Sequence, residues 1–141
     1  MENRRYLAVD YGDRRVGIAV SDPTGMIARP LETLKVSSPA EAISGLIELI
    51  REYEPAAIVL GRPLSMSGRE SELSQKVDEF ARALRAAVDI EIIYEDERLS
   101  STQAEQILHA HGKKIKGNKD KIDRMAAAIF LQTFLDRKFG V

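Results

Sequence analysis

The spacing of the apolar residues changes partway along this chain, and that change limits the folds it can adopt. Up to about residue 36, short apolar runs are separated by turn residues, which is typical of strands. From Ser38 onwards, segments with apolar residues at helical spacing alternate with short apolar runs. Strands joined by short links, followed by strand–helix units, predict a mixed sheet flanked by helices.

Each expected element has its own signal. The expected strands are 6–10, 15–21, about 27–34, 56–61 and 88–94. The first helix begins at Ser38-Pro39-Ala-Glu41, where Ser38 is the expected N-cap and Glu41 the capping-box partner. Later helices are expected around 73–84, after a cap at Ser100, and over about 121–137. A three-strand antiparallel meander plus two parallel strands gives an α/β fold with a five-stranded mixed sheet, and residues 1–141 suit a single domain.

Composition excludes several classes of site. The chain has no cysteine, which removes disulfides, thiolate zinc sites and cysteine nucleophiles, and which fits a reducing cytosol. Its beginning lacks the apolar run of a signal peptide, and no apolar stretch approaches the ~20 residues of a membrane span. We therefore expect a cytoplasmic protein without a membrane partner. The net charge of −1 excludes nothing, because a balanced total can hide a basic face.

Three acids fall where an α/β sheet places its sites. Asp10 ends the first strand, Glu97 follows the fifth, and Asp123 lies in the first turn of the last helix. Sites in such sheets lie at the carboxyl ends of the strands, so the three carboxylates are expected to converge. Asp96 competes with Glu97 for this role, because strand alternation lets one of the two neighbours face the site. Taken singly, each acid also has an ordinary explanation as a turn residue, a surface acid or a helix N-terminal acid.

Converging carboxylates suggest metal chemistry. Hard divalent cations such as Mg²⁺ prefer oxygen ligands. Two such ions about 3.5–4 Å apart can activate a water and stabilise the leaving oxygen when a phosphodiester is hydrolysed. The sequence therefore predicts a nuclease that holds Mg²⁺ or Mn²⁺, as two ions, on Asp10, Glu97 and Asp123.

Positive charge is concentrated just before Asp123. The segment 112–121 holds five lysines. Contacts between such side chains and phosphates bind nucleic acid without reading its sequence. The expected nucleic-acid-binding residues are Lys113, Lys114, Lys116 and Lys119, with Arg15, Arg62 and Arg98 near the strand ends. The lysine segment is equally well explained as a solvated loop, and Arg15 or Arg98 as an ion-pair partner of the local acids.

Five blocks of the sequence, in order along nearly the whole chain, resemble the YqgF family of bacterial proteins. These proteins are described as Holliday-junction-resolvase-like and as candidate pre-16S rRNA nucleases. The blocks are D-Y-G-D-R-R-V-G-I-A-V-S-D at 10–22, G-M-I-A-R-P-L-E-T-L at 25–34, G-R-P with Met66 and Gly68, D-E-R-L-S-S at 96–101, and I-D-R-M-A-A at 122–127 with Leu131 and Gln132.

The resemblance implies an RNase H-like fold and a nuclease whose acids fall on Asp10, Glu97 and Asp123. One departure bears on the site. Asp13 stands where the family often has a small hydroxyl residue, and it either disturbs metal binding or faces water.

The function expected from the resemblance is 5′-end maturation of pre-16S ribosomal RNA, with structured RNA or ribosomal particles as partners. Resolution of four-way DNA junctions is the alternative and would need the same site, with branched DNA as the partner. The expected oligomeric state is a monomer or a homodimer. A non-catalytic nucleic-acid-binding or transcription factor is the third hypothesis, and retention of all three acids argues against it. An actin-like ATPase is excluded, because 141 residues cannot supply the two domains that enclose its nucleotide.

Overall fold

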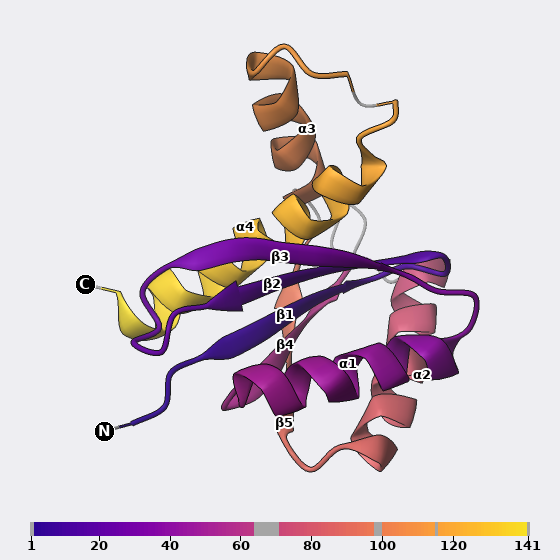
Figure 1. The fold of residues 1–141 in the computed structure, drawn as a ribbon, viewed down its shortest axis with the longest axis vertical. Helices are drawn as coiled ribbons and strands as arrows, with labels where there is room; N and C mark the ends of the chain where they lie inside the picture. Colours follow the sequence, from indigo (N-terminus) through magenta and orange to yellow (C-terminus); the bar gives the residue numbers. More distant parts are fainter. Residues whose placement is uncertain (1, 64–70, 98–99, 115, 141) are drawn as a thin grey trace.

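The predicted sheet is present, with its strands in the order β3-β2-β1-β4-β5. The computed structural model describes residues 2–63, 71–97, 100–114 and 116–140 (Figure 1). Its elements are β1 (Tyr6–Tyr11), β2 (Arg15–Ser21), β3 (Ala28–Lys35), α1 (Pro39–Tyr53), β4 (Ala57–Arg62), α2 (Glu72–Ala87), β5 (Glu91–Asp96), α3 (Ser100–Ala110) and α4 (Lys119–Phe139). The first three strands pair antiparallel, while β4 pairs parallel with β1 and with β5.

Alternation along β1 decides which helix covers which face of the sheet. Leu7, Val9 and Tyr11 join α1 and α2 in one apolar core. Tyr6 and Ala8 point the other way and pack with α4. Figure 1 shows the same three layers, with α1 and α2 on one side of the sheet and α4 on the other. Asp10 alternates with Val9 and Tyr11, so it faces α4.

The last helix, α4, has two apolar faces. Ala127, Phe130, Leu131 and Phe134 pack on the sheet. Ile122, Met125 and Ile129 pack instead against Ala104 and Leu108 of α3. The helix therefore packs against the sheet on one face and against α3 on the other. In Figure 1, α3 extends from α4 away from the sheet.

Most boundaries differ from the sequence prediction by one to three residues, and two of these differences are informative. β5 was expected over 88–94, but α2 continues to Ala87 and Val88 closes it by donating its N–H to Leu84. The strand therefore starts later and ends at Asp96. Ser100 is the first residue of α3, not the cap that precedes it.

The start of α1 differs in one detail. Ser38 is the N-cap and accepts the N–H of Glu41 at 3.2 Å, as predicted. The Glu41 carboxylate, however, accepts a hydrogen bond from the Ser37 hydroxyl, so it does not complete a capping box.

Candidate active site

Gly17 brings the last helix against the strand next to Asp10. In the antiparallel β1–β2 pair, Gly17 is the residue opposite Asp10. A Cβ added at Gly17 would lie 2.2 Å from the backbone oxygen of Asp123 and 2.8 Å from the backbone nitrogen of Arg124. The backbone of α4 thus occupies the space that a side chain would fill, and Asp123 reaches the end of β1 for that reason.

Gly61 makes a similar space for Glu97. A Cβ at Gly61 of β4 would lie 2.9 Å from the Glu97 carboxyl carbon and 2.7 Å from the Phe130 ring. Glu97 is the residue after β5 and is 8% exposed, whereas Asp96 is exposed. The Glu97 carboxyl group passes over the bare β4 backbone and forms a hydrogen bond with Asp10. Glu97, not Asp96, is therefore the acid that meets Asp10.

Crowding of these carboxyl groups raises their pKa values. The pKa of Asp10 is raised from 3.8 to about 6, first by burial and also by the Asp123 charge, against the opposing effects of Glu97 and Arg15. The pKa of Glu97 lies well above its ordinary value, first because of burial and then because of the Asp10 charge. Burial also raises the pKa of Asp123, although its bond to Arg15 opposes this. A proton or a cation is needed among these groups at neutral pH.

Arg15 supplies part of the counter-charge. Its Nε donates to Asp123 Oδ2 at 2.6 Å, and Asp120 lies 3.9 Å away. This is the ion-pair interpretation that the sequence left open for Arg15. Within the described residues, no group of three or more Asp, Glu or His side chains is already arranged as a metal site. Arg15 holds the third carboxylate, while Asp10 and Glu97 form a hydrogen bond with each other.

Asp10 and Asp123 line a cleft that adjoins a basic cleft. The first cleft, about 430 Å³, is lined by Asp10, Asp123, Arg14 and Arg15, among others. The second, about 410 Å³, shares Arg14 and Arg15 and adds Lys35 and Lys119. A polyanion lying in the second cleft would reach the carboxylates of the first.

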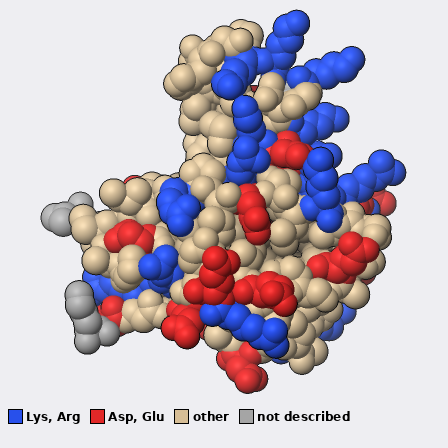
Figure 2. All heavy atoms as spheres, viewed as in Figure 1, with Lys and Arg blue, Asp and Glu red and all other residues tan. Residues whose placement is uncertain are grey.

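The predicted lysines project from the segment between α3 and α4. Lys113, Lys114, Lys116 and Lys119 are all exposed. In Figure 2, lysine and arginine side chains gather at the upper right, where Figure 1 places this segment. The neighbouring Lys113 ammonium lowers the pKa of Lys121, which is the electrostatic signature of crowded like charges.

Of the remaining predicted arginines, one does not join this group. Arg62 lies on the α2 side of the sheet and bonds to Asp78, with 2.9 Å between its Nη2 and Asp78 Oδ2. Arg98 lies outside the described residues. Asp13, the departure from the family pattern, lines the same cleft as Asp10 and Asp123, and its carboxylate pairs with Lys76 at 2.8 Å.

Sequence reasoning missed an ion pair near the site between a buried carboxylate and an exposed guanidinium. Glu95 is 6% exposed, and both of its oxygens accept from the Arg137 guanidinium, at 2.9 and 2.6 Å. This pair joins the end of β5 to the end of α4. Sequence reasoning also missed the roles of Gly17 and Gly61, although glycine inside a strand is a known sign of close backbone approach.

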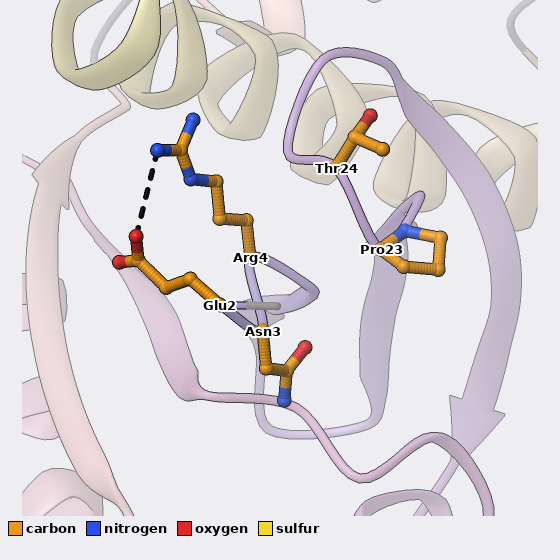
Figure 3. Close-up of a pocket in the computed structure, with 5 residues that line it drawn as sticks. All are labelled: Glu2, Asn3, Arg4, Pro23 and Thr24. Carbon is orange, nitrogen blue, oxygen red and sulfur yellow. Dashed lines mark hydrogen bonds and ion pairs between the residues drawn. The ribbon is translucent and has the colours of Figure 1, made fainter.

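A separate hollow lies at the other end of β1. Figure 3 shows its lining residues Glu2, Asn3, Arg4, Pro23 and Thr24, with Arg4 and Glu2 3.5 Å apart. Because it sits at the amino end of β1, while Asp10 is at the carboxyl end, it takes no part in the carboxylate site.

Replacing Gly17 by alanine is expected to damage both fold and site. The new Cβ would have to push the Asp123 backbone away, which costs about 1–3 kcal/mol or more. Cleavage should fall as well, because Asp123 moves. Gly45→Ala is the matched control, since its Cβ would meet only the flexible end of Leu34 at 2.8 Å and helical alanine is favoured by about 1 kcal/mol. Urea unfolding measures the stability of both variants. Equal stability of the two would show that the packing of α4 does not depend on Gly17.

Comparison with known proteins agrees with this geometry. The sequence model of the family described as "RuvX: Holliday junction resolvase" matches residues 4–137. A relative from Roseiflexus sp. (strain RS-1), named "Putative pre-16S rRNA nuclease", is 40% identical over 96% of each chain. A relative of the same name from Lactococcus lactis subsp. cremoris (strain SK11) is 40% identical over 94% of each chain.

Solved structures share the fold at low sequence identity. Thermus thermophilus RuvC, in complex with a Holliday junction, has a TM-score of 0.56 at 19% identity and covers 96% of both chains. The yeast mitochondrial Holliday junction resolvase Ydc2 has a TM-score of 0.57 at 14% identity, over 95% of this chain and 78% of that one. None of the described helices is long and apolar enough to cross a membrane. The predicted RNase H-like fold and family resemblance are thus confirmed, and the chain belongs to the RuvX family of Holliday junction resolvases.

Proposed function

We propose that this protein is a metal-dependent nuclease that hydrolyses phosphodiester bonds, with Asp10, Glu97 and Asp123 as its catalytic metal ligands. The observation that carries the proposal is the meeting of Asp10 and Glu97 beside Asp123 at the carboxyl edge of the sheet. The names of the relatives and of the family support nuclease activity. We further propose that residues 1–141 act as one domain.

The donor set fits Mg²⁺ or Mn²⁺. All three side chains offer oxygen, the ligand atom that these cations prefer, and the raised pKa values mark a place where positive charge is favourable. When bound, two such ions would polarise the phosphate and lower the pKa of the attacking water. The chain's own part is to hold the carboxylates in place through Gly17 and Gly61, and to bring the phosphate near them.

Arg15 has a second part in this scheme. If Asp123 holds a cation, its bond to Arg15 would weaken, and the guanidinium would be available for a substrate phosphate. A guanidinium matches phosphate geometry through paired hydrogen bonds. Arg15 lines both clefts, which supports its contact with the backbone entering from the basic one.

We propose precursor 16S ribosomal RNA as the substrate, free or within a ribosomal particle, and the cytoplasm as the compartment. The relatives' names favour this RNA. The family's name favours a four-way DNA junction as the alternative. A panel of precursor rRNA ends, assembled ribosomal particles, single-stranded RNA and a four-way junction, incubated with Mg²⁺ or Mn²⁺, distinguishes them. Symmetric junction cutting would also require a dimer, which the solution mass reports. If no member of the panel is cut, the nuclease proposal is overturned in favour of a binding factor.

Replacing Lys113, Lys114 and Lys116 together by alanine should weaken substrate binding and flatten its dependence on salt. Each lost phosphate contact lowers the slope of log affinity against log salt by about 0.7–0.9, so a change of about two to three is expected. Fluorescence anisotropy over a salt series measures this. An unchanged slope would identify the segment as solvated surface.

A further inference from the structure

A second basic pocket lies on the opposite face of the sheet from the carboxylates. It has a volume of about 620 Å³ and is lined by Arg62, Asp78, Arg82, Arg85 and Tyr94. Among the described residues that line it, three carry a guanidinium group and one carries a carboxylate, so this part of the lining has an excess of positive charge. We name it the arginine pocket.

Asp78, the acid among the described lining residues, already accepts hydrogen bonds from two other side chains. Asp78 accepts from Arg62 through both oxygens, at 3.0 and 2.9 Å, and from the Tyr94 hydroxyl at 2.8 Å. The Arg62 guanidinium lowers the pKa of Asp78, so this carboxyl is charged at neutral pH. Its bonds fix Arg62 and Tyr94 in place, which preorganises one wall of the pocket.

The positive charges of the other two arginines are not neutralised by an ion pair within the described part of the chain. Arg82 and Arg85 follow Asp78 on α2 at spacings that put them on the same helical face, and both are exposed. Neither forms an ion pair with another described residue. The Arg85 and Arg62 guanidinium carbons lie 5.5 and 5.8 Å from the centre of the Tyr94 ring. Cations gathered in this way would be stabilised by an anion between them.

The arginine pocket and the carboxylates share one edge of the sheet. Gly61 and Arg62 are neighbours on β4, and their side-chain positions face opposite sides. Glu97 donates its backbone N–H to the carbonyl of Arg62, at 3.5 Å. The backbone that holds Glu97 toward α4 is therefore the one that carries Arg62 toward α2. A nucleic-acid strand that crosses the carboxyl edge of β4 and β5 would pass from one site to the other.

We propose that the arginine pocket binds phosphate groups of the nucleic-acid substrate and holds a second stretch of its backbone away from the bond that is cut. The inference rests on the proposed function for the identity of the ligand. Guanidinium groups bind phosphate oxygens with paired hydrogen bonds, which gives affinity and position without base recognition. A substrate gripped on both faces of the sheet must be long, folded or branched, and a short single strand would miss this contact.

The test removes Arg82 and Arg85 together by alanine in a chain that also carries Asp10→Asn, so that the substrate stays intact. Both side chains are exposed, so the fold is expected to persist. The probes are a structured precursor-rRNA fragment and a four-way DNA junction. Two lost phosphate contacts should lower the salt slope by about 1.4–1.8 and weaken binding by about tenfold at low salt. The control, Arg51→Ala with Lys138→Ala, removes the same charge at other exposed positions and should leave the slope almost unchanged.

A crosslinking measurement locates the contact directly. Because the chain has no cysteine, Arg82→Cys creates a single site for a photoactivatable label. Crosslinks to nucleotides distant from the cleaved bond are expected, and Arg51→Cys should give none. An unchanged salt slope, or crosslinks no stronger than from Arg51→Cys, would overturn the pocket even if the protein cuts its substrate. Conversely, if the parent protein cuts no substrate but the double variant still loses binding, the pocket is supported and the nuclease proposal is refuted.

Discussion

Asp10→Asn is expected to abolish cleavage while the protein remains folded. Asparagine keeps the shape of the side chain but removes its charge and one metal-binding oxygen. A loss of at least about a thousandfold, equivalent to about 4 kcal/mol of transition-state stabilisation, is expected for a ligand of catalytic metal ions. Single-turnover cleavage of the preferred substrate measures the loss, and circular dichroism checks the fold.

Asp13→Asn is the matched control for that variant. Asp13 lies three residues further along the chain and lines the same cleft, but its carboxylate pairs with Lys76 instead of with Glu97. Its activity should stay within a few-fold of the parent. An Asp10→Asn protein as active as the Asp13→Asn protein would contradict the proposed role of Asp10.

The stability of the metal-free protein is expected to fall as pH rises from about 4 to about 6. The pKa of Asp10 is raised from 3.8 to about 6 in the folded state, so the folded protein holds this proton more tightly than the unfolded chain. The stabilisation is fully present below about pH 4 and is lost as pH passes the folded value. Its size is on the order of 3 kcal/mol for Asp10, and Glu97 acts in the same direction.

Divalent metal should reverse this loss. At pH 7 to 8 the carboxylates are available as ligands, and saturating Mg²⁺ or Mn²⁺ should raise Tm by roughly 5–10 °C. Near pH 4 the same addition should have little effect, because protons compete for the oxygens. Thermal unfolding across pH, with and without metal, measures both trends. Equal metal stabilisation of the parent and of Asp10→Asn would place the cation elsewhere.

The sheet was predictable from the sequence because its signals are local. Turn residues at 11–14 and 22–25 mark the meander, and apolar runs mark the central strands. The start of β5 was misplaced because Val88 and Ile90 continue the apolar alternation, yet they pack against the core from the loop after α2. Periodicity cannot distinguish a strand from a loop whose apolar residues point inwards.

The site was predictable in its acids but not in its contacts. The resemblance placed Asp10, Glu97 and Asp123, and strand alternation limited the choice between Asp96 and Glu97 to one. Three ion pairs form between side chains that are 16 to 108 residues apart in the sequence. They are Arg15 with Asp123, Arg137 with Glu95, and Arg62 with Asp78. No spacing rule connects such residues, because their meeting is a property of the packed sheet and helices.

Direct measurement of metal binding tests the central claim of a carboxylate metal site. Mn²⁺ bound by the parent, Glu97→Gln and Asp96→Asn proteins can be counted by electron paramagnetic resonance at pH 7.5, without any substrate or cleavage. The account predicts strong binding by the parent, almost the same binding by Asp96→Asn, and at least about a tenfold loss of affinity in Glu97→Gln. Equal Mn²⁺ affinity in the parent and Glu97→Gln, or a loss confined to Asp96→Asn, would contradict it.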